Sequence, residues 1–308
     1  MEQLRIGYCG PKEKWERMKW NEFVEYAAKN NVQLVWVDLT KPIEPQGPFN
    51  LIIHKMTYSM KGHDMHCNKE IEELYNYSKS HPEVRFIDDL DHVAVTLDRE
   101  ELNSKLSSIK WPSDMPISVP QAIMFNDEPT LENLIKITEN IPFPILAKPK
   151  DASSTVQAHT LRLATSVDQL VGVRSPSLLQ QYINHNGVVY KLYALGDNII
   201  PGVRPSTRNV EPGECLNIDF FSQPSEAAKS IWTPNRDLSN VEMPIEDFQK
   251  ISKVLRKELG MELIGFDILI DKDKHYWLVD LNYFPGYKNV DGLWEKFLNF
   301  MIEQINKK

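Results

Sequence analysis

Residues 265–287 carry the feature that most limits what this chain can fold into: two apolar segments joined by a short polar turn. Strands are predicted at Phe266–Ile270 and Tyr276–Asn282, because each is rich in aliphatic and aromatic residues, and Asp271–Lys274 has turn chemistry. The pattern predicts an antiparallel hairpin. Such a hairpin places the start of its first strand beside the end of its second, so residues from both ends of the stretch should meet.

Three oxygen-bearing side chains fall at that meeting point. Asp267 lies near the start of the first strand, while Asp280 and Asn282, two apart and so on one face, end the second. Two carboxylates and an amide suit Mg²⁺, which takes one or two protein carboxylates and fills its octahedron with water and phosphate oxygens. The alternative is a solvated acidic rim. We favour the metal, because carboxylates clustered beside an apolar ribbon are costly without a cation.

Composition narrows the class of protein. The chain has 308 residues and a formal net charge of −8, which argues against nucleic-acid or membrane partners held by bulk attraction but permits a local anion site. Three cysteines (Cys9, Cys67 and Cys215) make neither a disulfide framework nor a zinc pattern, so reduced thiols are expected. Lacking an apolar leader or membrane-length run, the chain is expected to be a soluble cytoplasmic monomer, with nuclear access left open.

The first 90 residues alternate strands with helices. Strands are predicted at Leu4–Tyr8, Val32–Val37, Leu51–Ile53 and Val84–Ile87, and helices at Lys14–Asn30 and Asn68–Lys79. Alternation of this kind is typical of a parallel α/β unit, whose ligands gather at the carboxyl ends of the strands. Lys14 and Lys55 both fall there, so they are candidate ligand contacts.

Past residue 90 the pattern changes to strands and scattered helices. An α/β (α+β) chain of three units is expected, with boundaries at 1–90, 91–180 and 181–308. The polar stretch Leu216–Asn240 is predicted to be a mobile loop or lid. Amphipathic helices are predicted at Pro244–Leu259 and Leu293–Ile305.

Further cations occupy strand ends. Lys148 can reach phosphates as a point charge, and the Ser/Thr-rich loop 151–158 that follows could cradle them, although a solvated hairpin loop fits equally well. His159 comes next. Lys191 sits in an apolar strand and is expected to face an anion, with snorkelling to the surface as the alternative. Arg204 could clamp a phosphate bidentately.

The segment 178–191 predicts two apolar strands linked through Gln181–Gly187, with a hairpin turn at Asn186–Gly187. Its peptide groups at Tyr182 and Ile183 would offer a donor and an acceptor to a purine ring. A metal hairpin that faces several cations suits phosphoryl transfer, because the metal and the cations together neutralise the charge of the transferring phosphate.

These segments resemble the inositol 1,3,4-trisphosphate 5/6-kinase family, also called inositol tetrakisphosphate 1-kinases, of the ATP-grasp superfamily. The resemblance is carried by Ile6–Tyr8, His54–Lys55, Ala147–Pro149, Gln180–Asn186 with Tyr190–Lys191, Arg204–Ser206, Gly265–Asp267 and Asp280–Tyr287. Asp38–Phe49 looks closest to plant-type members. In the loop after Lys148, where the family usually has a Gly-Thr pair, this chain has Asp151–Gln157.

The resemblance implies an ATP-grasp fold with an N-terminal α/β domain for inositol phosphate and two lobes that hold ATP. It implies ATP and Mg²⁺ as cofactors and an inositol polyphosphate as substrate. The implied nucleotide contacts are Arg99, Lys148, Gln180, Gln181, Tyr182, Ile183 and Ser206. The implied metal ligands are Asp267, Asp280 and Asn282, the substrate contacts Lys14, Lys55, His159, Lys191, Asn282 and Gly286, and the catalytic residues Lys191, Arg204 and Asp280.

The expected activity is therefore ATP-dependent transfer of phosphate to a hydroxyl of an inositol tris- or tetrakisphosphate. Extension of inositol hexakisphosphate to a pyrophosphate is left open. Two alternatives stand beside it: a non-catalytic sensor of inositol phosphate or nucleotide, and an ATP-grasp carboxylate–amine ligase, which would share the metal hairpin.

Overall fold

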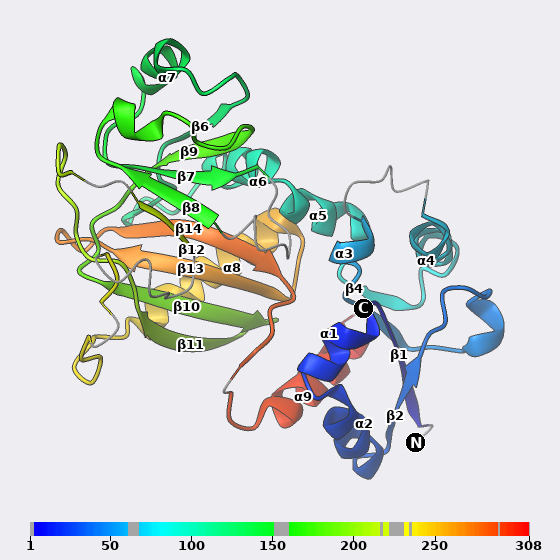
Figure 1. The fold of residues 1–308 in the computed structure, drawn as a ribbon. Coiled ribbons are helices and arrows are strands. Elements are labelled where there is room, and N and C mark those ends of the chain that lie inside the picture. The colour runs from blue at the N-terminus through cyan, green and yellow to red at the C-terminus, as the bar shows by residue number, and fades with distance from the viewer. Residues whose placement is uncertain are drawn as a thin grey trace.

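The computed structural model describes residues 3–60, 68–150, 160–215, 218–221, 231–233, 236–288 and 290–307. Within them three sheets form three layers of the molecule, with the first apart from the other two (Figure 1). Among these residues, no helix is both long and apolar enough to cross a lipid bilayer. Most helices and strands fall close to the predicted positions, and the differences are reported below.

The first sheet is the predicted parallel α/β unit. Its strand order is β2-β1-β3-β4, all parallel, from β1 (Leu4–Cys9), β2 (Val32–Trp36), β3 (Leu51–His54) and β4 (Arg85–Ile87). The predicted helix at 14–30 is two helices, α1 (Lys12–Arg17) and α2 (Trp20–Lys29), because Lys19 between them adopts a left-handed φ of 56°. Helices α3 (Thr57–Met60), α4 (Lys69–Ser80) and α5 (Leu90–Ala94) complete this part, with a short 3₁₀ turn at Glu44–Gln46.

The second sheet is antiparallel and has the order β12-β8-β7-β9-β6. Its strands are β6 (Ala122–Phe125), β7 (Ile145–Pro149), β8 (Thr160–Ala164), β9 (Ser177–Gln181) and β12 (Ile218–Phe221). One face is covered by α7 (Leu131–Thr138), which Thr130 caps through its side chain, and by the 3₁₀ turn Val167–Leu170. Strand β12 corrects the prediction of a mobile loop or lid for residues 218–221 of the segment 216–240. Residues 216–217, 222–230 and 234–235 of that segment lie outside the described chain.

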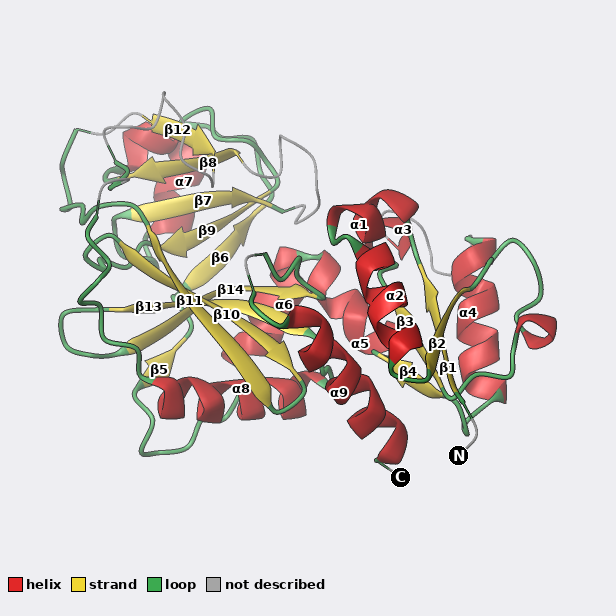
Figure 2. Ribbon diagram, turned by 90° about the horizontal axis from the view of Figure 1, so that it is seen from below, coloured by secondary structure: helices red, strands yellow, loops and turns green. Residues whose placement is uncertain are grey.

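The third sheet has the order β11-β10-β13-β14-β5 and contains the predicted metal hairpin. Its strands are β5 (Ile117–Ser118), β10 (Val188–Leu195), β11 (Asn198–Pro205), β13 (Ile264–Ile270) and β14 (Tyr276–Tyr283). Helix α8 (Ile245–Leu259) covers one face and ends at Gly260, whose φ of 65° stops the helix (Figure 2). Helix α6 (Arg99–Ser107), capped by Asp98, follows the 3₁₀ turn Val95–Leu97.

The pairing of β9 and β10 differs from the prediction. Asn186 and Gly187 do form a tight turn, with φ of 53° and 71° and a bond from Val188 N–H to the His185 carbonyl of 3.3 Å. The strands on either side of it, however, belong to different sheets. The segment predicted as a hairpin therefore links the second sheet to the third.

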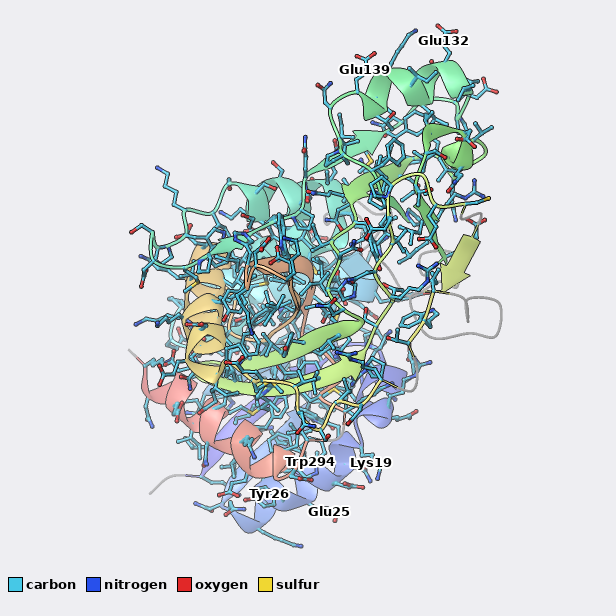
Figure 3. The ribbon with its side chains drawn as sticks, turned by 90° about the vertical axis from the view of Figure 1, so that its left-hand side faces the viewer. Lys19, Glu25, Tyr26, Glu132, Glu139 and Trp294 are labelled. Atoms are coloured by element: carbon cyan, nitrogen blue, oxygen red, sulfur yellow. The ribbon has the colours of Figure 1, made fainter. Side chains whose placement is uncertain are left out.

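The first and third sheets share one continuous hydrophobic core, whereas the second sheet has its own. Helix α9 (Leu293–Asn306) lies between the first and third sheets and packs on α2, β3 and β10. Its Trp294 ring stacks on Phe23, with the ring centres 5.3 Å apart. Figure 3 shows Trp294 beside the α2 end of the molecule, opposite Glu132 and Glu139 of the second sheet's layer. Packing thus holds the N-terminal domain against the sheet that contains the β13–β14 hairpin.

Gly265 marks a close approach in that shared core. A Cβ there would lie 2.9 Å from Pro285 and 3.4 Å from the Tyr193 ring. We expect Gly265→Ala to destabilise the protein by about 1–3 kcal/mol through overpacking, measured as a lower urea midpoint. Gly202→Ala in the same sheet is the matched control, because its Cβ would lie an ordinary 3.5 Å from the Lys191 carbonyl oxygen. Equal midpoints for the two variants would contradict this account.

Candidate active site

A cavity of about 560 Å³ lies between the second and third sheets. Most of the predicted nucleotide, metal and catalytic residues line it. They are Arg99, Lys148, Gln180, Gln181, Tyr182, Ile183, Lys191, Arg204, Asp267, Asp280 and Asn282. The cavity therefore gathers side chains from α6, β7, β9, β10, β11, β13 and β14, which are far apart in sequence.

Its floor is a row of residues paired directly across four strands: Gly202, Lys191, Asp267 and Asp280. Residues directly opposite one another project to the same face of a sheet, so the lysine and both carboxylates point together. Gly202 contributes no side chain at the end of the row. Arg204, two residues on in β11, faces the same cavity and lies 3.5 Å from the Tyr193 hydroxyl.

A β-bulge makes this row possible. Asp267 pairs with Asp280 and Ile268 with Leu278, so Val279 is an extra residue in β14. The Val279 carbonyl accepts a hydrogen bond of 3.1 Å from Lys148 of the second sheet, which bridges the cavity. Burial, the largest cause, lowers the pKa of Lys148 to about 8 although Asp280 and Asp267 oppose that shift.

The two carboxylates are held by neighbours within the third sheet. Lys191 Nζ donates to both oxygens of Asp267, at 2.8 and 2.5 Å, and the Asn282 amide donates to Asp280 at 3.0 Å. Burial raises the pKa of Asp267, with Asp280 adding to the rise and Lys191 opposing it. Two carboxylates that face each other repel, and a cation between them would stabilise the pair.

The residues present fit a divalent cation. Among the described residues, no group of three or more His, Cys, Asp or Glu side chains is arranged to hold a metal. A cation between Asp267 and Asp280 would therefore take Asn282 as its third ligand, and hard oxygens from two carboxylates and an amide are suitable donors. The amide would have to present its oxygen, and Asp267 would be shared with Lys191.

On the nucleotide side of the cavity, one of the two backbone donors considered for a purine is already paired. Tyr182 N–H donates to the Pro144 carbonyl at 2.8 Å, so it is not the donor that a purine would use. The Ile183 N–H makes no hydrogen bond within the described part of the chain, and we assign it that role as a prediction. Gln180 is buried, and Arg99 reaches the Pro149 carbonyl.

Ser206 does not line the cavity, although Pro205 and Thr207 on either side do. Its hydroxyl is 2.8 Å from His185 Nε2, and the His185 Nδ1 is 2.6 Å from the Ile183 carbonyl. Burial lowers the pKa of His185 to about 4, so the ring is neutral. Ser206 thus contacts His185, which lines the cavity, and does not itself reach it.

Lys14 and Lys55 come from the N-terminal domain and lie outside this cavity's lining. Lys55 Nζ donates to the Phe284 carbonyl at 2.5 Å and lies 4.2 Å from the centre of the Phe284 ring. Lys55 therefore contacts a residue, Phe284, that is two positions after Asn282 in the chain. Burial, and next the charge of Lys14, lower the pKa of Lys55 to about 7.

The other two predicted substrate contacts have different outcomes. His159 and the loop 151–158 lie outside the described residues. Gly286 is exposed, and a Cβ there would meet nothing nearer than Lys288 Cγ at 4.0 Å, so space alone does not require glycine. Lining residues that the sequence did not indicate include Lys288, His185, Thr207, Trp232, Leu146 and Leu161. His185 and Lys288 lie in or beside segments already singled out.

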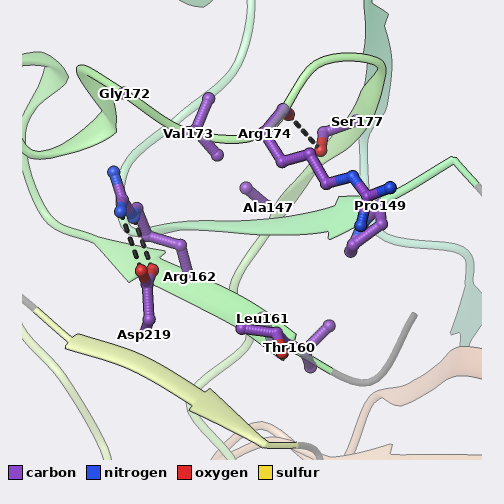
Figure 4. A pocket seen from close by; sticks show the side chains of 10 residues that line it. All are labelled: Ala147, Pro149, Thr160, Leu161, Arg162, Gly172, Val173, Arg174, Ser177 and Asp219. Carbon is purple, nitrogen blue, oxygen red and sulfur yellow. Dashed lines mark hydrogen bonds and ion pairs between the residues drawn. The ribbon is translucent and has the colours of Figure 1, made fainter. Parts of the chain in front are cut away.

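A second cavity, of about 280 Å³, lies on the other face of the second sheet (Figure 4). Arg162 in its wall is already paired with Asp219 through two contacts of 2.6 and 2.8 Å. Ser177 donates to the Arg174 carbonyl at 2.5 Å. Leu161 contributes to the lining of both cavities, but none of the predicted site residues lines this one.

Two sheets enclosing a cavity, with a lysine on one and paired carboxylates on the other, define the class: this is an ATP-grasp protein. D-alanine–D-alanine ligase from Bacillus anthracis matches with a TM-score of 0.59 and 15% identity, covering 98% of this chain and 97% of that one. The ATP-grasp ligase PsnB, complexed with a minimal precursor, matches with a TM-score of 0.62 and 11% identity, covering 99% and 100%. Identities this low show the fold alone.

Sequence comparison gives the family. Residues 5–93 match the pre-ATP-grasp domain, and residues 112–303 the ATP-grasp domain, of inositol 1,3,4-trisphosphate 5/6-kinases. The chain belongs to that family, and is thus an inositol polyphosphate kinase that uses ATP and a divalent metal. It is 29% identical to inositol-tetrakisphosphate 1-kinase of Danio rerio, covering 96% of this chain and 77% of the relative. It is 27% identical to inositol-tetrakisphosphate 1-kinase 1 of Oryza sativa subsp. indica, covering 100% and 86%. Because fish and rice relatives are similarly distant, the plant-type assignment stays a prediction.

Proposed function

We propose that this protein transfers the γ-phosphate of ATP to a free hydroxyl of an inositol tris- or tetrakisphosphate, with Mg²⁺ as its cation. The single observation that carries the proposal is the row Lys191–Asp267–Asp280 on the cavity floor, facing Lys148 across it. Magnesium held by Asp267, Asp280 and Asn282 would neutralise the charge that develops on the transferring phosphate.

The other residues have roles that follow from their positions. Lys148 and Arg99 would hold the nucleotide phosphates, and the segment Gln180–Ile183 would face adenine. Arg204, on the open face of β11, would contact the transferring group. Lys14, Lys55 and His159 would hold the phosphates of the sugar and so select the hydroxyl that points at ATP.

Domain roles follow the same division. The unit 1–90 would bind the inositol phosphate, and the units 91–180 and 181–308 would bind the nucleotide between their sheets. Strands β5 and β12 each pair in the sheet of the other unit, so the two nucleotide lobes exchange strands.

The test is a transfer assay with purified protein, ATP, Mg²⁺ and a panel of inositol tris-, tetrakis- and hexakisphosphates, followed by separation of products. We expect phosphorylation of at least one tris- or tetrakisphosphate. Tight calorimetric binding with no product from any isomer would instead support a sensor. Phosphate release that needs a carboxylate and an amine would support a ligase.

Lys55 gives a prediction about pH. In the free protein its pKa is lowered to about 7, so above that pH it is largely neutral. A bound phosphate stabilises the charged form and raises the pKa again, so binding should take up a proton and weaken as pH rises. At about pH 8, where phosphate monoesters are already doubly ionised, calorimetry in two buffers of different ionisation enthalpy should report uptake of up to about one proton.

Lys55→Arg is the control for this experiment, because a guanidinium stays charged throughout. Its proton uptake should vanish. Uptake of equal size in Lys55→Arg and the unchanged protein would show that another group titrates.

A further inference from the structure

A closed set of hydrogen bonds ties the N-terminal domain to the metal hairpin. The Asp88 carboxylate, just after β4, accepts the backbone N–H groups of Glu262 and Leu263 at 2.9 and 3.0 Å. The Leu263 carbonyl accepts Phe284 N–H at 2.8 Å, and the Phe284 carbonyl accepts Lys55 Nζ at 2.5 Å. These bonds connect Asp88 of the N-terminal domain, through the C-terminal part of the chain, to Lys55, a predicted substrate contact of the N-terminal domain.

A second group of hydrogen bonds connects Asp88 to His54, the residue before Lys55. His54 Nε2 lies 2.6 Å from the Asp88 carbonyl. The Tyr283 hydroxyl accepts the Asp88 N–H at 2.8 Å and donates to the His54 carbonyl at 3.1 Å. Tyr283 follows Asn282 directly, so one aromatic side chain connects the metal hairpin to both N-terminal residues.

All three side chains are buried: His54 is 0%, Asp88 2% and Tyr283 7% exposed. In such a setting an unsatisfied polar group is costly, so each bond constrains the others. Both carboxylate oxygens of Asp88 accept N–H groups from the segment between α8 and β13, and its own N–H and carbonyl contact Tyr283 and His54. It bonds directly to Glu262, Leu263, His54 and Tyr283, and reaches Phe284 through Leu263 and Lys55 through Leu263 and Phe284.

We propose that Asp88 is a positioning residue: through Leu263, Phe284 and Tyr283 it sets where Lys55 stands relative to the metal hairpin. It touches neither substrate nor nucleotide. We expect it to affect binding of the inositol phosphate and not of ATP. The residues predicted to hold ATP (Lys148, Arg99 and Gln180–Ile183) make none of the hydrogen bonds in this set. The inference rests on the proposed function.

The distinguishing measurement is a comparison of two Michaelis constants. Asp88→Asn keeps the size and shape of the side chain but places an amide N–H₂ against one of the two backbone N–H donors, so one hydrogen bond of the set is lost. We expect KM for the inositol phosphate to rise roughly 10-fold or more with kcat reduced, and KM for MgATP to stay within about 2-fold. Calorimetric affinity for the inositol phosphate should fall in parallel, which gives a readout independent of turnover.

Two further variants make the result decisive. Tyr283→Phe removes the bridging hydroxyl and should show the same split in smaller degree; it decides the matter if Asp88→Asn does not fold. His92→Ala is the matched control, because His92 makes an exposed contact of 3.1 Å with the Gly260 carbonyl across the same interface but lies outside this set of hydrogen bonds. It should leave both constants unchanged.

Failures of the two proposals can be told apart. If the unchanged protein phosphorylates no inositol phosphate, the proposed function falls and this inference with it. If it does, and the folded variants of Asp88 and Tyr283 keep an unchanged KM for inositol phosphate or raise both constants equally, Asp88 is structural only and the inference is overturned.

Discussion

Asp280→Asn is expected to lower kcat by roughly 10³-fold or more, which corresponds to about 4 kcal/mol of lost transition-state stabilisation. Asp280 stands opposite Asp267 in the row on the cavity floor, and an amide in its place removes one of the two anionic ligands that we propose for the cation. The side chain is partly exposed, so the fold should persist. The measurement combines steady-state kinetics with the Mg²⁺ dependence of nucleotide binding.

Asp273→Asn is the matched control for this variant. Asp273 lies in the turn of the same hairpin, is exposed and contacts Lys272. The substitution removes the same charge from the same ribbon, about one strand length away from the row, and should leave kcat within about 2-fold. Comparable losses in the two variants would show that net charge, and not a metal site, explains the effect.

Lys191→Met is expected to have the second largest effect, and a split one. Lys191 occupies both oxygens of Asp267, so its removal frees that carboxylate for a cation. Affinity for Mg²⁺ alone should rise, while kcat should fall by roughly 10²–10³-fold because a preorganised cation is lost from the floor of the cavity. Thermal stabilisation by Mg²⁺ measures the first quantity, and turnover the second.

Lys274→Met controls for loss of a lysine in this sheet. Lys274 pairs with Glu242 at 3.2 Å, and both side chains are largely exposed. Exposed pairs contribute little, so neither Mg²⁺ affinity nor turnover should change. Weaker Mg²⁺ binding in Lys191→Met would contradict the competition between lysine and metal for Asp267.

The hairpin that carries Asp267, Asp280 and Asn282 was predictable from sequence because its signal is local. Two apolar segments, a polar turn and acidic ends all lie within 23 residues, and the structure places the strands at Ile264–Ile270 and Tyr276–Tyr283. The bulge was missed, yet it has a local signal. Buried Leu278 and Leu281 are three residues apart, which breaks the period of two and marks the extra residue Val279.

Long-range pairing explains what sequence could not give. Asn186–Gly187 fixes a turn, but the sheet that each flanking strand joins is decided by Gln121 and Pro144 on one side and by β11 and β13 on the other. Likewise Lys191 and Asp267 are 76 positions apart, and only the register of β10 on β13 brings them together. Asp88 appears in the sequence as one acidic residue among several, since its partners lie near residue 263.

A Mn²⁺-substituted crystal with a non-hydrolysable ATP analogue tests the central claim most directly, because the anomalous signal of manganese locates the cation. The account predicts a peak about 2.0–2.3 Å from oxygens of Asp267, Asp280 and Asn282 and from the nucleotide phosphates. Bound nucleotide with no peak at the row, or with a peak whose ligands exclude both carboxylates, would contradict it.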